Sequence, residues 1–133
     1  MSKGKLIGTR VVLGIWIVIC LGSGLGFLLI PQTMYESFVP GAKEPLTDIM
    51  RVLIGSAGTV SIPWAVAGVI AFRSPIENRG LLQAIIVAMG LFGLLGLVSD
   101  VILKSEATIM DFLFIVLAVV LLAFYPGLKK AVA

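Results

Sequence analysis

The sequence reads VLIGSAGTVSIPWAVAGVIAF over residues 52–72 and GLLQAIIVAMGLFGLLGLVS over residues 80–99, and neither run contains a charged residue. A helix rises about 1.5 Å per residue, so an apolar run of about 20 residues can cross a bilayer. The polar segment RSPIENR separates the two runs. Its Ser74, Pro75 and Glu77 have the spacing of a helix N-terminus. These features predict a transmembrane hairpin whose second helix begins at residue 75.

Two further apolar runs lie outside this hairpin, at residues 11–30 and 109–125. The basic N-terminus followed by the first run also resembles a signal peptide. Its apolar core exceeds the usual length of about 7–15 residues, and no small-residue cleavage site follows, so we expect a retained span. The last run follows a cap-like pattern at Thr108 and ends before Pro126.

The sequence therefore predicts an all-α protein, a transmembrane four-helix up-down bundle in one domain covering residues 1–133. The expected spans cover residues 10–30, 49–72, 75–103 and 109–125. Pro63 lies in the middle of the second span and is expected to kink it. Residues 31–47 form the longest connection, which three prolines interrupt. Its aromatic residues are expected at headgroup level.

Composition agrees with this class, since 59% of the residues are hydrophobic and 13% are charged. The net charge of +3 does not indicate nucleic-acid binding, because the charges lie at the predicted membrane boundaries. The absence of histidine removes the commonest general base and metal ligand. The single cysteine, Cys20, cannot form an internal disulfide.

Basic residues predict the orientation, because cytoplasmic loops carry an excess of Lys and Arg. Four spans place the N-terminus, the 73–79 turn and the C-terminus on one side, which holds Lys3, Lys5, Arg10, Arg73, Arg79, Lys129 and Lys130. The opposite side holds only Lys43, Arg51 and Lys104. Both termini are therefore expected in the cytoplasm, and the chain is expected to be a multi-pass protein of the cell membrane.

Arg51 and Asp100 are the main candidate site residues, one at each outer end of the hairpin. Charges near the low-dielectric interior are costly unless they are paired, so a structural ion pair is the favoured interpretation. A proton or substrate site is the alternative.

Glycines recur on one face of three spans, and such faces let membrane helices approach closely. A hairpin centred near residues 75–76 pairs Gly55 with Gly96, whereas one centred nearer Ser74 pairs Gly55 with Gly93. The candidate helix-packing residues are Gly22, Gly26, Gly55, Gly58, Gly93 and Gly96.

The remaining sulfur and polar side chains give only weak signals for metal binding or catalysis. Met34, Met50 and Met110 near the outer boundary have thioethers that suit Cu(I), but methionine at an interface is more often filler. The acids on that side lack the fixed spacing of a cation site. We expect no catalytic residue, metal or cofactor in this chain. The remaining polar groups of the spans are Ser23, Ser56, Thr59, Ser61 and Gln83, and the hydroxyls are expected to bond backbone or a neighbouring helix.

The runs GFLLIP at residues 26–31 and RVLIG at residues 51–55 resemble small four-helix membrane proteins of the DoxX-like and BphX-like kind. The resemblance implies an accessory role beside membrane redox complexes. The four-span multidrug exporters are not matched, because residues 11–30 contain no acid.

Two functions are therefore expected from the sequence. The first is a non-catalytic accessory or assembly subunit of a larger membrane complex such as an oxidase or monooxygenase, in contact with lipid and with other subunits or further copies of itself. The second is a small transporter or binder of an apolar molecule, which would use the kink at Pro63.

Overall fold

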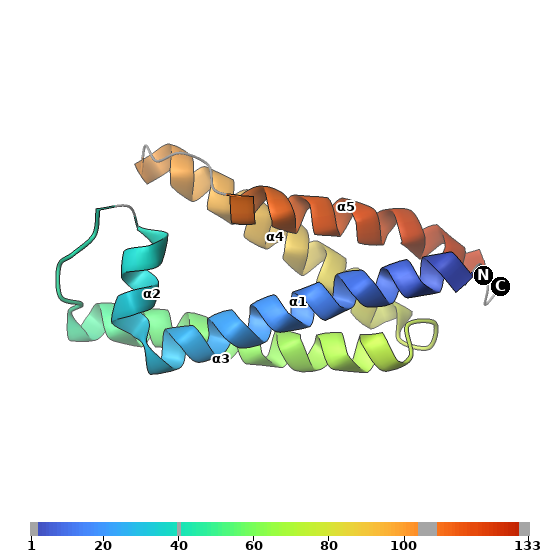
Figure 1. Cartoon of the computed structure of the whole chain (residues 1–133), viewed down its shortest axis with the longest axis horizontal. Helices are drawn as coiled ribbons and strands as arrows, with labels where there is room; N and C mark the ends of the chain where they lie inside the picture. The colour runs from blue at the N-terminus through green and yellow to red at the C-terminus, as the bar shows by residue number, and fades with distance from the viewer. Residues whose placement is uncertain (1–2, 40, 104–108, 131–133) are drawn as a thin grey trace. The chain divides into compact units, whose positions relative to one another are not determined.

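The computed structural model describes residues 3–39, 41–103 and 109–130, without the side chains of residues 103, 109–111 and 126–130. This part of the chain consists of α-helices joined by turns and irregular segments, with no strand, which confirms the predicted all-α class. The elements, shown in Figure 1, are α1 (Lys3–Leu29), α2 (Pro31–Phe38), α3 (Asp48–Arg73), α4 (Arg79–Leu103) and α5 (Ile109–Lys130).

Three of these helices, α1, α3 and α4, are long and apolar enough to cross a membrane. They contain 27, 26 and 25 residues, so each exceeds the length needed for a hydrocarbon core of about 30 Å. Helix α5 contributes a shorter apolar stretch, Phe112–Tyr125. Helix α3 continues through Pro63, as expected of a proline inside a membrane helix.

Helix boundaries differ from the expected spans at several ends. Helix α1 begins at Lys3, so the basic N-terminal residues belong to the helix. Helix α4 begins at Arg79 rather than at residue 75. The backbone and side-chain amides of Asn78 donate to the Ser74 carbonyl at 3.1 and 3.0 Å, which closes a turn where a helix start was expected. Helix α5 passes Pro126, and the cap expected at Thr108 lies outside the described residues.

Helix α2 was not expected, because three prolines interrupt its segment. Pro31 occupies the first turn of this helix, where its missing N–H group costs no hydrogen bond. The proline that follows α1 therefore also starts α2. The Gln32 side chain then holds the next loop, donating to the Glu44 carbonyl at 3.0 Å and accepting from the Leu46 amide at 3.0 Å.

The chain divides into two compact units, Met1–Gly14 with Ala67–Ala133, and Ile15–Val66. In the first unit α4 packs against α5, with the rings of Phe92 and Phe114 6.2 Å apart. The Gln83 side chain donates to the Tyr125 hydroxyl at 2.5 Å, which adds a polar link between these helices. In the second unit Trp16 of α1 meets Trp64 of α3 edge to face, with centroids 6.4 Å apart.

Side-chain hydroxyls in the long helices bond their own backbone, which confirms the expectation for Ser23, Ser56, Thr59 and Ser61. Each donates to the carbonyl four residues earlier, where an unsatisfied group in lipid would be costly. The oxygen–oxygen distances are 2.7–3.0 Å for Thr9, Ser23, Ser56, Thr59, Ser61 and Ser99.

Candidate functional site

Helices α1 and α3 approach closely where Gly24 meets Gly58. A Cβ atom built on Gly58 would lie 2.7 Å from the Gly24 carbonyl oxygen, and one built on Gly24 would lie 3.2 Å from the Gly58 oxygen. At Gly58 a Cβ would collide with backbone, whereas at Gly24 it would fit only if its neighbours shifted slightly. Gly58 was predicted to be a packing residue, but Gly24 was not, because the GxxxG spacing of Gly22 and Gly26 indicates a different face of α1.

The other candidate glycines of this unit lie in two different surroundings. Gly26 is covered by α2, because a Cβ there would lie 2.8 Å from the Met34 sulfur. Gly22 and Gly55 are open: among the described residues, no atom lies within 4 Å of a Cβ at either position. A small-residue notch at Gly22 therefore remains on the surface of α1.

The candidate glycines of the other unit lie on α4, where Gly93 is buried and Gly96 is half-buried. Gly8, which was not among the predicted packing residues, lies beneath the ring of Phe124 of α5 in the same unit. Its signal was weak, because Gly8 lies before the first apolar run, although it follows Gly4 at GxxxG spacing.

Arg51 and Asp100 belong to different units, so their pairing stays a prediction. Arg51 is exposed in the first turns of α3, and Asp100 is half-buried near the end of α4. An ion pair with one exposed partner contributes at most about 1 kcal/mol.

We therefore expect Asp100→Asn to lower the free energy of unfolding by about 1 kcal/mol or less. The double exchange Arg51→Asp with Asp100→Arg should restore part of that loss, since the opposite charges face each other again. Equilibrium unfolding in mixed micelles measures both. The pairing would be contradicted if the double exchange lost more unfolding free energy than its two single variants lose together.

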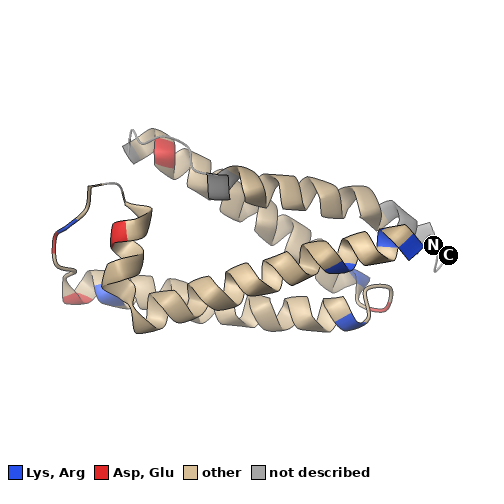
Figure 2. Cartoon of the chain, viewed as in Figure 1, with Lys and Arg blue, Asp and Glu red and all other residues tan. Residues whose placement is uncertain are grey.

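A polar pocket of about 190 Å³ lies where the start of α1 meets the turn between α3 and α4, both in the first unit. Arg10 anchors this region: its Nε donates to the Phe72 carbonyl at 3.2 Å and its Nη2 donates to the Arg73 carbonyl at 3.4 Å. Those carbonyls end α3, where a cation is favourable to the helix dipole. Figure 2 shows that basic residues of this unit gather at this end. The pocket is lined by Leu6, Arg10, Arg73, Ser74, Pro75, Ile76 and Glu77.

The described residues provide no visible metal chemistry, since no group of three or more His, Cys, Asp or Glu residues is close enough to hold an ion. The Met34 sulfur faces Gly26, and the Met110 side chain lies outside the described residues. Pro63, at the kink that a transporter function would use, has an exposed side chain. A second pocket, on α3, is lined by Asp48, Ile49, Val52 and Leu53, and its lining is almost wholly apolar.

Comparison with known proteins adds no assignment, because no family model, curated protein or solved structure matches the chain.

Proposed function

We propose that the chain is a multi-pass protein of the cell membrane with four spans in an up-down bundle and both termini in the cytoplasm. Three long apolar helices support the membrane setting, and the apolar part of α5 supports a fourth span. The basic residues at the start of α1 and around the 73–79 turn support the orientation. The resemblance to DoxX-like and BphX-like proteins supports the same layout.

We further propose that its role is that of a non-catalytic accessory or assembly subunit in a membrane protein complex, in the manner of an oxidase or monooxygenase subunit. The open notch at Gly22 carries this proposal. The flanking side chains on α1 are apolar and exposed, with Val18 71%, Leu21 44% and Leu25 43% accessible. A small residue between exposed apolar side chains is the surface that a second membrane helix packs against.

The assembly proposal predicts that the protein leaves its native membrane as part of a larger complex. Gly22→Leu should fill the notch and reduce the assembled fraction about tenfold, since overpacking costs about 1–3 kcal/mol. Gentle detergent extraction followed by native gels measures the fraction.

Val60→Leu is the matched control, because it enlarges an exposed apolar residue of α3, outside the notch on α1, and should leave assembly intact. Equal assembly of Gly22→Leu and the parent would contradict the role of the notch. Migration of the parent solely as a monomer, with saturable uptake of a small molecule by vesicles containing only this chain, would favour the transporter function instead.

A further inference from the structure

The pocket between the start of α1 and the 73–79 turn contains a cation and an anion, Arg10 and Glu77, that do not form an ion pair within the described part of the chain. Arg10 uses Nε and one Nη2 hydrogen on the carbonyls of α3, and its remaining N–H groups stay available to an anion. Glu77 is exposed and offers carboxylate oxygens to a cation.

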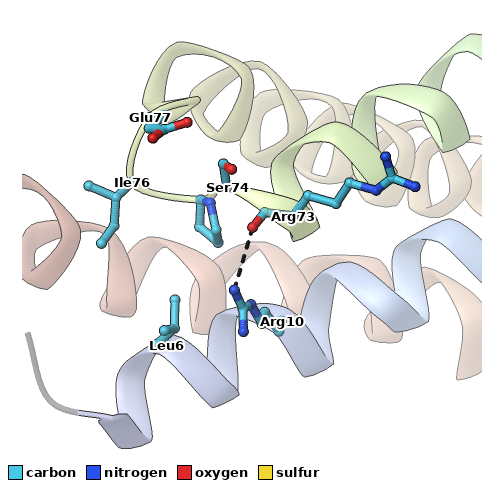
Figure 3. Close-up of a pocket in the computed structure, with 7 residues that line it drawn as sticks. Leu6, Arg10, Arg73, Ser74, Ile76 and Glu77 are labelled. Atoms are coloured by element: carbon cyan, nitrogen blue, oxygen red, sulfur yellow. Dashed lines mark hydrogen bonds between the residues drawn. The ribbon is translucent and has the colours of Figure 1, made fainter.

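The apolar part of the lining fits an amphiphile. Leu6 and Ile76 are half-buried beside these charges, and Ile7 on the next position of α1 is 62% exposed. In Figure 3, Leu6 of α1 and Ile76 of the turn point toward each other, and Arg10 reaches the Arg73 carbonyl. Glu77 lies higher on the turn, beyond Ser74 as seen from α1, and the Arg73 guanidinium extends away from Arg10. A cation, a hydroxyl, an anion and apolar side chains therefore share one small space.

The volume of the pocket and the charges that line it restrict the kind of ligand that it can bind. A volume of about 190 Å³ is below the range of about 300–1,000 Å³ typical of pockets for drug-sized ligands, so a headgroup fits better than a whole metabolite. A purely anionic headgroup would meet the Glu77 carboxylate and the carbonyl end of α3, both of which repel it. A headgroup that carries both a phosphate and an ammonium would satisfy both sides.

We propose that this pocket binds the headgroup of a phospholipid bearing a phosphodiester and a primary ammonium, as in phosphatidylethanolamine. The phosphate accepts hydrogen bonds from Arg10 and Ser74, and the ammonium donates to Glu77. The acyl chains lie along the exposed apolar side of α1. This inference depends on the proposed membrane setting but not on the proposed assembly role.

Native mass spectrometry of the delipidated full chain in detergent tests the inference, with phosphatidylethanolamine and phosphatidylglycerol of identical acyl chains in competition. The parent should bind phosphatidylethanolamine about two- to fivefold more tightly, the size expected of a partly solvated ion pair. Glu77→Gln should bring the ratio close to one. Glu36→Gln, an exposed acid on α2 outside the pocket, is the matched control and should keep the parent's ratio.

Equal binding of the two lipids by the parent, or the same loss of preference in Glu36→Gln, would overturn the inference. Full competition by free phosphoethanolamine at the lipid's concentration would overturn the lipid as ligand. Arg10→Lys should weaken both lipids together, because an ammonium cannot donate to both carbonyls and the phosphate in the same way. Alkaline carbonate extraction of native membranes tests the membrane setting separately from the lipid site. A chain that stays in the membrane but shows no lipid preference refutes the lipid site and leaves the membrane setting intact.

Discussion

Replacing Gly58 with leucine should lower the free energy of unfolding by about 3 kcal/mol. The new side chain would begin 2.7 Å from the Gly24 carbonyl oxygen and 3.1 Å from the Phe27 Cβ. Backbone cannot give way as a flexible side chain can, so α1 and α3 must separate. Their contact is held mainly by close packing, because lipid provides no hydrophobic force between helices. Equilibrium unfolding in mixed micelles measures the loss.

Gly55→Leu is the matched control for this prediction. Gly55 lies on the same helix one turn earlier, and no described atom lies within 4 Å of a Cβ there. The control replaces the same residue type with the same side chain, so it should stay within about 0.5 kcal/mol of the parent. Equal destabilisation by both variants would show that leucine disturbs α3 itself and that the Gly24–Gly58 contact is not tight.

Trp16→Ala should produce the other large effect, a loss of about 2–3 kcal/mol of unfolding free energy. Trp16 is fully buried and its ring meets that of Trp64 at 6.4 Å. In lipid the transfer of apolar atoms contributes little, so the cost comes from the cavity and from lost ring contacts. The expected loss is therefore smaller than the roughly 3–5 kcal/mol that the same change costs in a soluble core.

Trp16→Phe keeps an aromatic ring against Trp64, so it should lose less than half of the unfolding free energy that Trp16→Ala loses. Trp64→Ala is the reciprocal variant, and because Trp64 is only half-buried its effect should be smaller than that of Trp16→Ala. Both follow from the same unfolding experiment. A parent-like Trp16→Ala would mean that this ring does not hold α1 to α3.

The long helices could be predicted from the sequence because hydropathy and length decide them directly. Lipid forces each apolar segment to satisfy its backbone internally, which leaves the helix as the form for these runs. The same requirement explains why the behaviour of Ser56 and Thr59 was predictable, since a hydroxyl in a helix always has a carbonyl four residues earlier within reach. These properties depend on the segment itself and need no knowledge of its neighbours.

Tertiary contacts were not predictable in the same way. Gly22, Gly24 and Gly26 lie two residues apart, and the sequence does not say which of them meets another helix. The structure selects Gly24, because helix rotation and crossing position are set by the partner's side chains. Helix α2 was missed for a related reason: Pro31 is compatible both with a break and with a helix start.

The polar pocket was missed because its parts lie far apart in the sequence and look like topology signals. Arg10 fits a basic N-terminus and Glu77 fits a helix cap, so each had a sufficient local explanation. Only the fold brings the first turns of α1 beside the 73–79 turn and directs Arg10 to the carbonyls that end α3.

Thiol labelling in intact cells tests the four-span topology most directly. Single cysteines at Ser2, Asn78 and Val132 in a Cys20→Ala background should all resist a membrane-impermeant thiol reagent and react after permeabilisation. A cysteine at Lys43, in the loop after α2, is the positive control and should react in intact cells. Protection of Asn78→Cys with labelling of Lys43→Cys is the predicted result. Labelling of Asn78→Cys in intact cells would contradict the four-span arrangement with cytoplasmic termini.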